Sequence, residues 1–298
     1  MYLIDEVEVH NGLGECILWD DRVQKLLWTD MPGKRFYRYH PAQRQLENFA
    51  LPEDLCSFAM IENSDWLLAA FQSGLARYQP ESGAIEWFYR LPEGAPLRLN
   101  DGRCDAHGRF WVGSLIDLPN CFSPKPSEQG KLYRVDHSGS VSEHLDQVRL
   151  SNSLCWSPDN TRLYFSDSTK KCIDYYEFDS AKGELGAGRT LINVDPAFNP
   201  DGSVTDKDGY LWNALWGSGK VIRVSPQGQI DTSLTLPVSQ PACVTFAGPK
   251  LDWLVVSTGT YSLSDAQRKA QASAGNLFIY QTPFTGKLEH RFIDKMSK

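Results

Sequence analysis

The sequence predicts an all-β fold, a six-bladed β-propeller, and three observations support this prediction. A short unit of two aromatic and aliphatic strands recurs six times along the 298 residues, Asp and Gly turns separate the strands, and no long stretch has helical periodicity. Hairpins that repeat every ~40–50 residues are typical of four-stranded propeller blades.

Each repeat begins with a strand rich in Leu, Trp, Tyr and Phe. The starts lie at residues 26, 66, 109, 162, 210 and 253, with spacings of 40, 43, 53, 48 and 43 residues. Turns such as Asp105-Ala106-His107-Gly108 and Asp208-Gly209 lie between the strands. Six copies without a linker of biased composition predict one domain over residues 1–298. An irregular β-sandwich is the alternative, and Ser264–Ala274 is a short helix or equally a loop.

Composition and charge exclude several classes of protein. The net charge is −7 with a pI near 5.4, which argues against a nucleic-acid surface built from clustered Lys and Arg. No run approaches the ~18 apolar residues that span a bilayer, so we expect no membrane contact. The first residues, Met1 to Glu6, lack a basic segment followed by an apolar one, so we expect no signal peptide and a cytoplasmic location.

The cysteines point to the same compartment. There are seven of them, an odd number, without a CxxC pair. This pattern suggests neither a disulfide framework nor a zinc site, and we expect reduced, mostly buried thiols. A closed propeller can stand alone, so we expect a monomer or a weak homo-oligomer.

Polar segments interrupt the repeat about ten residues before four of the strand starts. They are Gly12-Leu13-Gly14-Glu15, Arg98-Leu99-Asn100-Asp101-Gly102, Ser151-Asn152-Ser153-Leu154 and Pro200-Asp201-Gly202. This offset places each segment on the innermost strand of its blade or on the turn that enters it. A single Asp-Gly or Asn near a strand is usually a turn residue, so the repeated offset carries the argument.

Inner strands of a propeller converge on the central channel, where Glu15, Asn152 and Asp201 can share one cation. Two carboxylates and an amide oxygen suit a hard ion such as Ca²⁺, Mg²⁺ or Mn²⁺. The six His residues show no ligand spacing, which argues against a classical zinc site. Flexible oxygen ligands nevertheless accept several divalent ions, Fe²⁺ and Zn²⁺ included, and we take Ca²⁺ as the first expectation.

These segments resemble the gluconolactonase, regucalcin and luciferin-regenerating-enzyme family. The resemblance runs from residue 13 to about residue 223, and a weaker match extends almost to the end of the chain. The matching stretches are Leu13-Gly14-Glu15 with Trp19, Arg98 to Gly102, Asp105 to Gly113, Ser151-Asn152 with Trp156-Ser157-Pro158-Asp159, Leu163-Tyr164 with Asp167-Ser168, Pro200-Asp201-Gly202, Asp208-Gly209 with Leu211-Trp212, Arg223, Phe246 to Pro249, and Ala274 to Phe278.

The resemblance implies a metal-dependent hydrolase that opens sugar lactones to aldonic acids. It implies one divalent metal held by Glu15, Asn152 and Asp201, and a substrate held by Arg98 and Asn100. Asp117 falls where many relatives place a further substrate-contacting carboxylate. On general chemistry, a ligand carboxylate keeps one oxygen free to accept a proton, so Asp201 is the candidate general base.

The sequence departs from the family pattern in three segments. Cys16 replaces the usual Pro after Gly-Glu-Gly, and the Gly expected after the ligand Glu15 is lost. Ser153 replaces the Gly after Asn152, and Phe246-Ala247-Gly248 has one Gly fewer than is common. These departures bear on substrate identity and rate. No basic residue near Cys16 in the sequence lowers its pKa, so we do not expect it to be a nucleophile.

Three other functions remain as alternatives. A non-catalytic, calcium-binding regulatory propeller needs only the three metal ligands. A metal-dependent phosphoesterase would use the same metal with a richer cationic lining than one Arg. A protein-binding propeller of the WD type would have no use for carboxylates in its channel.

Overall fold

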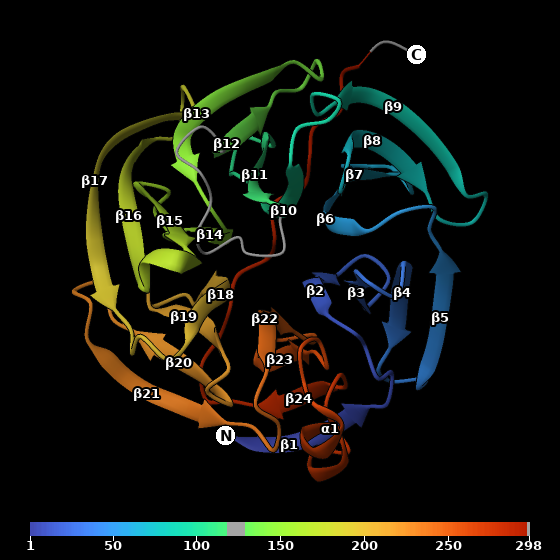
Figure 1. Cartoon of the computed structure of the whole chain (residues 1–298), viewed down its shortest axis with the longest axis vertical. Helices are drawn as coiled ribbons and strands as arrows, with labels where there is room; N and C mark the ends of the chain where they lie inside the picture. Colours follow the sequence, from blue (N-terminus) through green and yellow to red (C-terminus); the bar gives the residue numbers. More distant parts are fainter. Residues whose placement is uncertain (118–128, 297–298) are drawn as a thin grey trace.

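The computed structural model describes residues 1–117 and 129–296, and in them six four-stranded antiparallel sheets stand in a ring around a central axis (Figure 1). The sheets are the six blades of a β-propeller, which confirms the predicted fold class. We number the blades I to VI in the order of their innermost strands. Residues 118–128, which include Cys121, lie outside the described residues.

Each blade runs from an inner strand at the axis to an outer strand at the rim. The inner strands are β2 (Gly14–Asp20), β6 (Leu55–Met60), β10 (Leu97–Cys104), β14 (Ser151–Trp156), β18 (Asn199–Thr205) and β22 (Pro241–Ala247). The second strands are β3 (Lys25–Asp30), β7 (Leu67–Phe71), β11 (Phe110–Ile116), β15 (Arg162–Asp167), β19 (Leu211–Trp216) and β23 (Trp253–Thr258). The third strands are β4 (Arg35–His40), β8 (Gly74–Gln79), β12 (Gly130–Val135), β16 (Cys172–Asp179), β20 (Lys220–Val224) and β24 (Leu277–Gln281). The outer strands are β5 (Gln45–Ala50), β9 (Ala84–Arg90), β13 (Val141–Val148), β17 (Glu184–Asn193), β21 (Ile230–Thr235) and β1 (Tyr2–Val7).

The six predicted repeats correspond to the second and third strands of the six blades, which confirms the positions read from the sequence. The four polar segments lie on inner strands, as expected. Ser264–Ala274 contains the short helix α1 (Asp265–Ala270), which begins with a capping box between Ser264 and Gln267. A single 3₁₀ turn, η1 (Ser168–Lys170), follows β15.

The N-terminal strand closes the ring. Strand β1 pairs antiparallel with β24 and becomes the outer strand of blade VI, whose order is β1-β24-β23-β22. The sequence repeat did not reveal this closure, because the outer strand of that blade comes from the opposite end of the chain.

Apolar residues of adjoining inner and second strands fill the space between blades. Every residue of β6, β7, β14 and β22 is buried, whereas the residues of the outer strand β5 are all exposed or half-buried. Trp28, Trp111 and Trp212 are fully buried, as their role in core packing requires. The six cysteines among the described residues are buried and free, in agreement with the expected reduced thiols.

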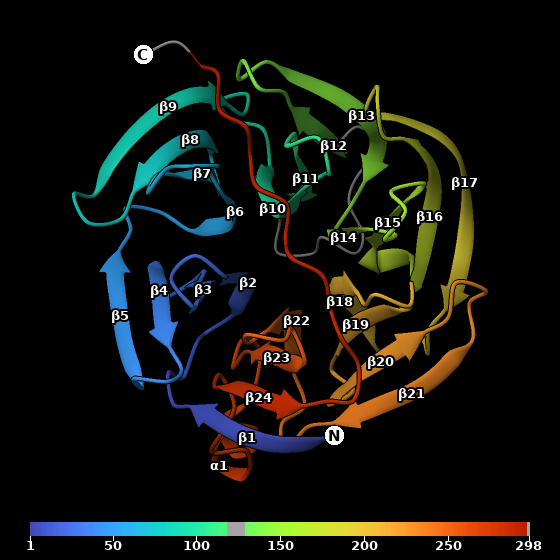
Figure 2. The ribbon, with the colours of Figure 1, turned by 180° about the vertical axis from the view of Figure 1, so that it is seen from behind.

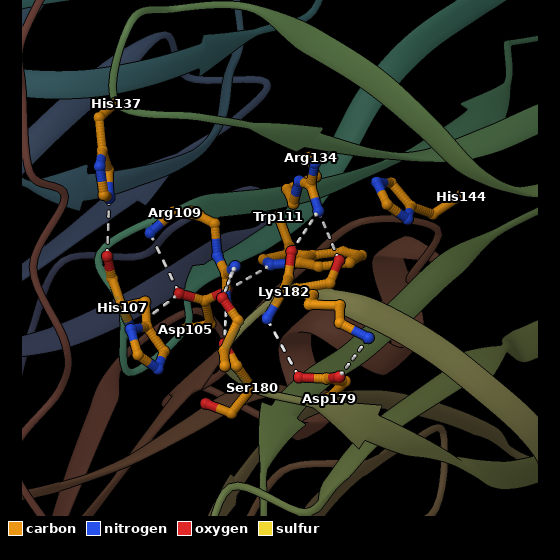
Figure 3. Close-up of polar contacts among 12 residues, drawn as sticks. Asp105, His107, Arg109, Trp111, Arg134, His137, His144, Asp179, Ser180 and Lys182 are labelled. Carbon is orange, nitrogen blue, oxygen red and sulfur yellow. Dashed lines mark hydrogen bonds and ion pairs between the residues drawn. The ribbon is translucent and has the colours of Figure 1, made fainter.

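In blades III and V, an Asp side chain stabilises the turn that connects the inner strand to the second strand. The carboxylate of Asp105 accepts hydrogen bonds from the backbone N–H groups of His107 (2.9 Å) and Arg109 (3.1 Å). It also accepts bonds from the Trp111 indole (2.9 Å) and from Arg109 Nε (2.7 Å), as Figure 3 shows. The Arg109 guanidinium then reaches the carbonyl oxygen of Ser180 on the next blade (2.5 Å).

The residues after β24 cross the back of the ring (Figure 2). We call residues 282–296 the C-terminal strap. It forms isolated β-bridges from Gly286 to Asp206 and from Phe292 to Ile61, and Phe292 is fully buried. The strap thus joins blades that are distant in sequence. No helix in the described part of the chain is long and apolar enough to cross a membrane.

Candidate functional site

A cavity of about 450 Å³ opens at the end of the channel opposite the strap, where the inner strands begin. Residues from all six blades line it. All six predicted site residues are among them: Glu15, Arg98, Asn100, Asp117, Asn152 and Asp201. The structure therefore brings together the side chains that the sequence argument selected, while their roles stay predictions.

Bulges in the inner strands aim these side chains into the cavity. The pairing of β2 with β3 shifts between Glu15 and Leu18, and that of β14 with β15 shifts between Asn152 and Cys155. Strand β18 shifts between Pro200 and Ser203. A bulge adds one residue to a strand and changes the direction of the neighbouring side chain. Side chains that regular alternation would direct into the blade packing can therefore point to the axis.

The departures at Cys16 and Ser153 fall within these bulges. Cys16 has φ of 48° and Ser153 has φ of 65°, in the region where Gly carries no steric penalty. Both side chains form contacts that partly offset the penalty. Phe58 N donates to Cys16 Sγ (3.2 Å), and Ser153 Oγ donates to the carbonyl oxygen of Asp201 (2.6 Å).

Three carboxyl groups share the channel: Glu15, Asp101 and Asp201. Burial, and then the charge of Asp101, raises the pKa of Glu15. Burial, and then the charges of Glu15 and Asp101, raises the pKa of Asp201. Among the described residues, neither Glu15 nor Asp201 forms an ion pair with a Lys or Arg side chain. The carboxylates therefore repel one another across the channel.

Asn152 is held by a short hydrogen-bond network. Its Nδ2 donates to Ser168 Oγ (2.9 Å), and Ser168 Oγ donates to the carbonyl oxygen of Pro200 (2.6 Å), next to Asp201. Asn100 Nδ2 donates to Asn152 Oδ1 (3.0 Å) and to the carbonyl oxygen of Ser151 (2.8 Å). The network fixes the Asn152 amide and leaves Asn100 with only its carbonyl oxygen to offer a ligand.

Arg98 lies on the wall of the cavity. Its Nη1 donates to Cys56 Sγ (3.6 Å), and its Nε lies 3.9 Å from Asp117 Oδ1. Asp117 is 58% exposed at the mouth, so this ion pair is loose. Asp54 also lines the cavity. Burial lowers the pKa of Arg98, but Cys56, Asp117 and Asp54 together raise it above its usual value. Arg98 is therefore a cation that stays charged and keeps donor capacity for a ligand.

The donor set fits a hard divalent cation. Within residues 1–117 and 129–296, no three or more His, Cys, Asp and Glu side chains form a metal-binding group, and the candidate set combines two carboxylates with an amide. Glu15, Asp201 and Asn152 Oδ1 supply oxygen alone, and a cation would relieve the repulsion between the carboxylates. Burial raises the pKa of Cys16 to about 12, so its thiol stays protonated beside this set.

Sequence reasoning missed one carboxyl group of the channel, which is not part of the cavity lining, and several residues that line the cavity. Asp101 was part of a motif but was not selected, although its charge acts on both other carboxylates. Asp54 lies directly before inner strand β6, and the offset used for the other four blades would have found it. Trp216 and Tyr261 form an aromatic side of the cavity, and no sequence pattern distinguished them from core aromatics.

A six-bladed propeller with acidic and amide side chains in an axial cavity defines a class of proteins that bind small polar ligands or ions at the axis. Within that class, the chain belongs to the family described as SMP-30/Gluconolactonase/LRE-like region, whose model matches residues 13–260. The resemblance inferred from the motifs is thereby confirmed.

Individual relatives cover nearly the whole chain. The chain is 32% identical over 287 residues to an L-arabinolactonase of Azospirillum brasilense, covering 96% of this chain and 93% of the relative. It is 31% identical to a 6-deoxy-6-sulfogluconolactonase of Pseudomonas putida, covering 94% of each. A solved structure described as a calcium-binding protein, regucalcin, from Agrobacterium tumefaciens superposes with a TM-score of 0.90 at 26% identity, covering 97% of both chains.

Proposed function

We propose that this protein is a metal-dependent hydrolase that opens sugar lactones to aldonic acids in the axial cavity. The observation that carries the proposal is the convergence of Glu15, Asn152 and Asp201 with Arg98 and Asn100 around one cavity. Relatives that are named sugar lactonases support the choice of substrate class.

The two substrate-binding residues have different capacities. Arg98 can only donate hydrogen bonds, so it suits the carbonyl oxygen or a hydroxyl oxygen of the lactone. Asn100 has committed both amide hydrogens to Ser151 and Asn152, so its carbonyl oxygen accepts from a sugar hydroxyl. Asp117 stands beside Arg98 at the mouth and accepts from a second hydroxyl. Together these groups orient the ring over the floor of the cavity.

Glu15, Asn152 and Asp201 are the residues that would hold the divalent cation, with Ca²⁺ the first expectation. A bound cation supplies Lewis-acid stabilisation of negative charge on the lactone carbonyl oxygen. The network through Ser168 keeps Asn152 Oδ1 on the cavity side. The bulge at Asp201, fixed by Ser153 Oγ at 2.6 Å, holds that carboxylate in place.

Asp201 is the candidate general base. It accepts a proton from water as the water oxygen attacks the lactone carbonyl carbon. The ring C–O bond then breaks, and the departing ring oxygen takes that proton back from Asp201 to become a hydroxyl of the aldonic acid. The absence of an ion pair to Asp201 among the described residues leaves an oxygen available for this transfer.

The test is hydrolysis of a panel of aldono-lactones, followed with a pH indicator. Protein is treated with EDTA, and Ca²⁺, Mg²⁺, Mn²⁺, Zn²⁺ and Fe²⁺ are restored one at a time. We expect turnover above the spontaneous rate only with a restored cation. No turnover with any cation would contradict the proposal, as would full turnover in EDTA.

A non-catalytic calcium-binding role is the second candidate. The structural relative from Agrobacterium tumefaciens is described as a calcium-binding protein, which favours this role. Tight Ca²⁺ binding without turnover of any lactone would support this candidate. A phosphoesterase is less favoured, because Arg98 is the only Lys or Arg among the described residues that line the cavity.

A further inference from the structure

Arg103 lies buried in the channel beneath the candidate metal site. It belongs to β10 and its side chain is only 3% exposed. Its Nη1 contacts Glu289 Oε1 at 2.9 Å and the carbonyl oxygen of Ile17 at 3.5 Å, and its Nη2 contacts Cys243 Sγ at 3.5 Å. A buried guanidinium is costly unless it is paired, so these contacts need an account.

The contacts place the Arg103 guanidinium in the layer directly below the metal ligands. Ile17 follows Glu15 within the same bulge of β2. Cys243 packs against Gly202, where an added Cβ would lie 2.6 Å from Cys243 Sγ, and Gly202 is the neighbour of Asp201. The charge of Arg103 therefore lies close to the two strands that carry the carboxylate ligands, β2 with Glu15 and β18 with Asp201.

Arg103 acts electrostatically on the channel carboxyl groups. Its positive charge lowers the pKa of Asp101 and that of Glu15, against the larger effect of burial. The same charge repels a cation that approaches these carboxylates. The net effect of Arg103 on cation binding depends on how far a nearby negative charge compensates its positive charge.

The compensating charge comes from the C-terminal strap. Glu289 pairs with Arg103 from the far side of the channel, and its side chain is 15% exposed. The strap holds Glu289 in place through Lys287, whose Nζ donates to the carbonyl oxygen of Trp156 at 3.1 Å, and through the buried Phe292. The strap crosses the back of the ring near its centre (Figure 2).

We propose that the Arg103–Glu289 ion pair sets the cation affinity of the channel site, with Glu289 of the strap cancelling the repulsion that Arg103 would exert on the bound ion. Neither residue touches the ion or the substrate. They are positioning residues that act through the local charge, and the inference rests on the metal site proposed above.

The proposal predicts an order of affinities that follows the net charge of the pair. The Glu289→Gln variant leaves the pair at +1 and binds Ca²⁺ about tenfold more weakly than wild type. The Arg103→Gln variant leaves it at −1 and binds Ca²⁺ more tightly. The double variant, like wild type, has no net charge in the pair and returns close to the wild-type affinity.

Asp294→Asn is the matched control. Asp294 is a strap carboxylate that pairs with Arg77 at 3.0 Å and is 17% exposed, close to the 15% of Glu289. Its pair lies at the rim and not in the channel, so its loss loosens the strap without changing the channel charge. We expect the Ca²⁺ affinity of this variant to equal that of wild type.

The measurement is calorimetric titration of the EDTA-treated full chain with Ca²⁺ alone, with thermal unfolding in the absence and presence of Ca²⁺ as a second readout. Equal affinities of wild type, E289Q and R103Q overturn the inference alone, and an equal loss in E289Q and D294N does the same. No cation binding by wild type overturns the metal site and the inference together. If E289Q does not fold, R103Q against R103Q/E289Q carries the test, and R103Q must bind more tightly.

Discussion

Two groups of buried carboxylates in this molecule have opposite surroundings. Asp105 and Asp206, at the turns of blades III and V, are fully buried and each accepts two backbone N–H groups, a Trp indole and an arginine. Glu15 and Asp201, in the channel, have no ion pair among the described residues and repel each other.

The difference shows which carboxylates stabilise the fold by themselves. Burying a charge is favourable only when partners replace the lost water. The turn carboxylates have such partners within the protein, as Figure 3 shows for Asp105. The channel carboxylates lack them, so their burial destabilises the protein until an ion or a proton compensates, which is typical of functional sites.

The largest expected effect is on catalysis. We expect the Asp201→Asn variant to lose about 10³-fold in kcat/KM for its lactone, because the amide cannot accept the proton of water. Without cation it should be at least as stable as wild type, because the repulsion with Glu15 is gone. Lactone assays and urea unfolding check both parts, with the exposed Asp146→Asn of β13 as control. Full activity and undiminished cation affinity in D201N would show that Asp201 is neither base nor ligand.

The next effect is on stability. We expect Asp105→Asn to lower the free energy of unfolding by about 3–5 kcal/mol, because Arg109 stays buried without its carboxylate. Asp206→Asn is the matched comparison and should cost less, because Arg223 keeps Asp231 at 2.7 Å. Urea unfolding measures both, and the folded fraction should keep its specific activity. An equal loss in the two variants would contradict the compensation by Asp231.

Addition and removal of cation should separate the two groups of carboxylates. At a free Ca²⁺ concentration 100 times Kd, we expect a gain of about 2.7 kcal/mol in the free energy of unfolding. Wild type and D105N should both show this gain, whereas D201N should show little of it. Urea unfolding with Ca²⁺ and with EDTA provides the measurement. The same gain in D201N would mean that the ion binds elsewhere.

The smallest expected effect concerns the bulge next to Glu15. Cys16→Gly removes a left-handed penalty of about 1–2 kcal/mol and loses the contact with Phe58 N. Cys16→Ala keeps the penalty and loses the same contact. We therefore expect the free energy of unfolding of C16G to exceed that of C16A by about 1 kcal/mol in urea unfolding. This difference already allows for the flexibility that Gly adds to the unfolded chain. A more stable C16A would mean that the bulge is not strained at this residue.

Local patterns predicted the blades well. Trp28, Trp111 and Trp212 mark second strands whose neighbours are all buried, so the apolar repeat carries a strong signal. The candidate site followed from topology, because inner strands of a ring meet at the axis wherever they occur in the chain. Glu15 and Asp201 were therefore predicted to share the channel, and the structure brings them into one cavity.

What the sequence did not predict depends on contacts between distant segments. Asp101 looks like an ordinary turn residue, but its burial in the channel raises its pKa, and the charge of Arg103 opposes that rise. Glu289 lies in a segment without strand periodicity, and its partner Arg103 is almost two hundred residues away. The strain at Cys16 depends on a bulge that the residue pattern does not encode.

The pairing of β1 with β24 has a consequence for how the chain folds during its synthesis. Residues 2–7 leave the ribosome long before their partners at residues 277–281, which appear only when most of these 298 residues have emerged. Contacts of such long sequence separation form slowly, so the ring stays open while the blades accumulate. During that interval β1 has no partner strand, and its unpaired edge can pair with another chain. The speed with which the first strand docks thus decides between a closed ring and aggregation.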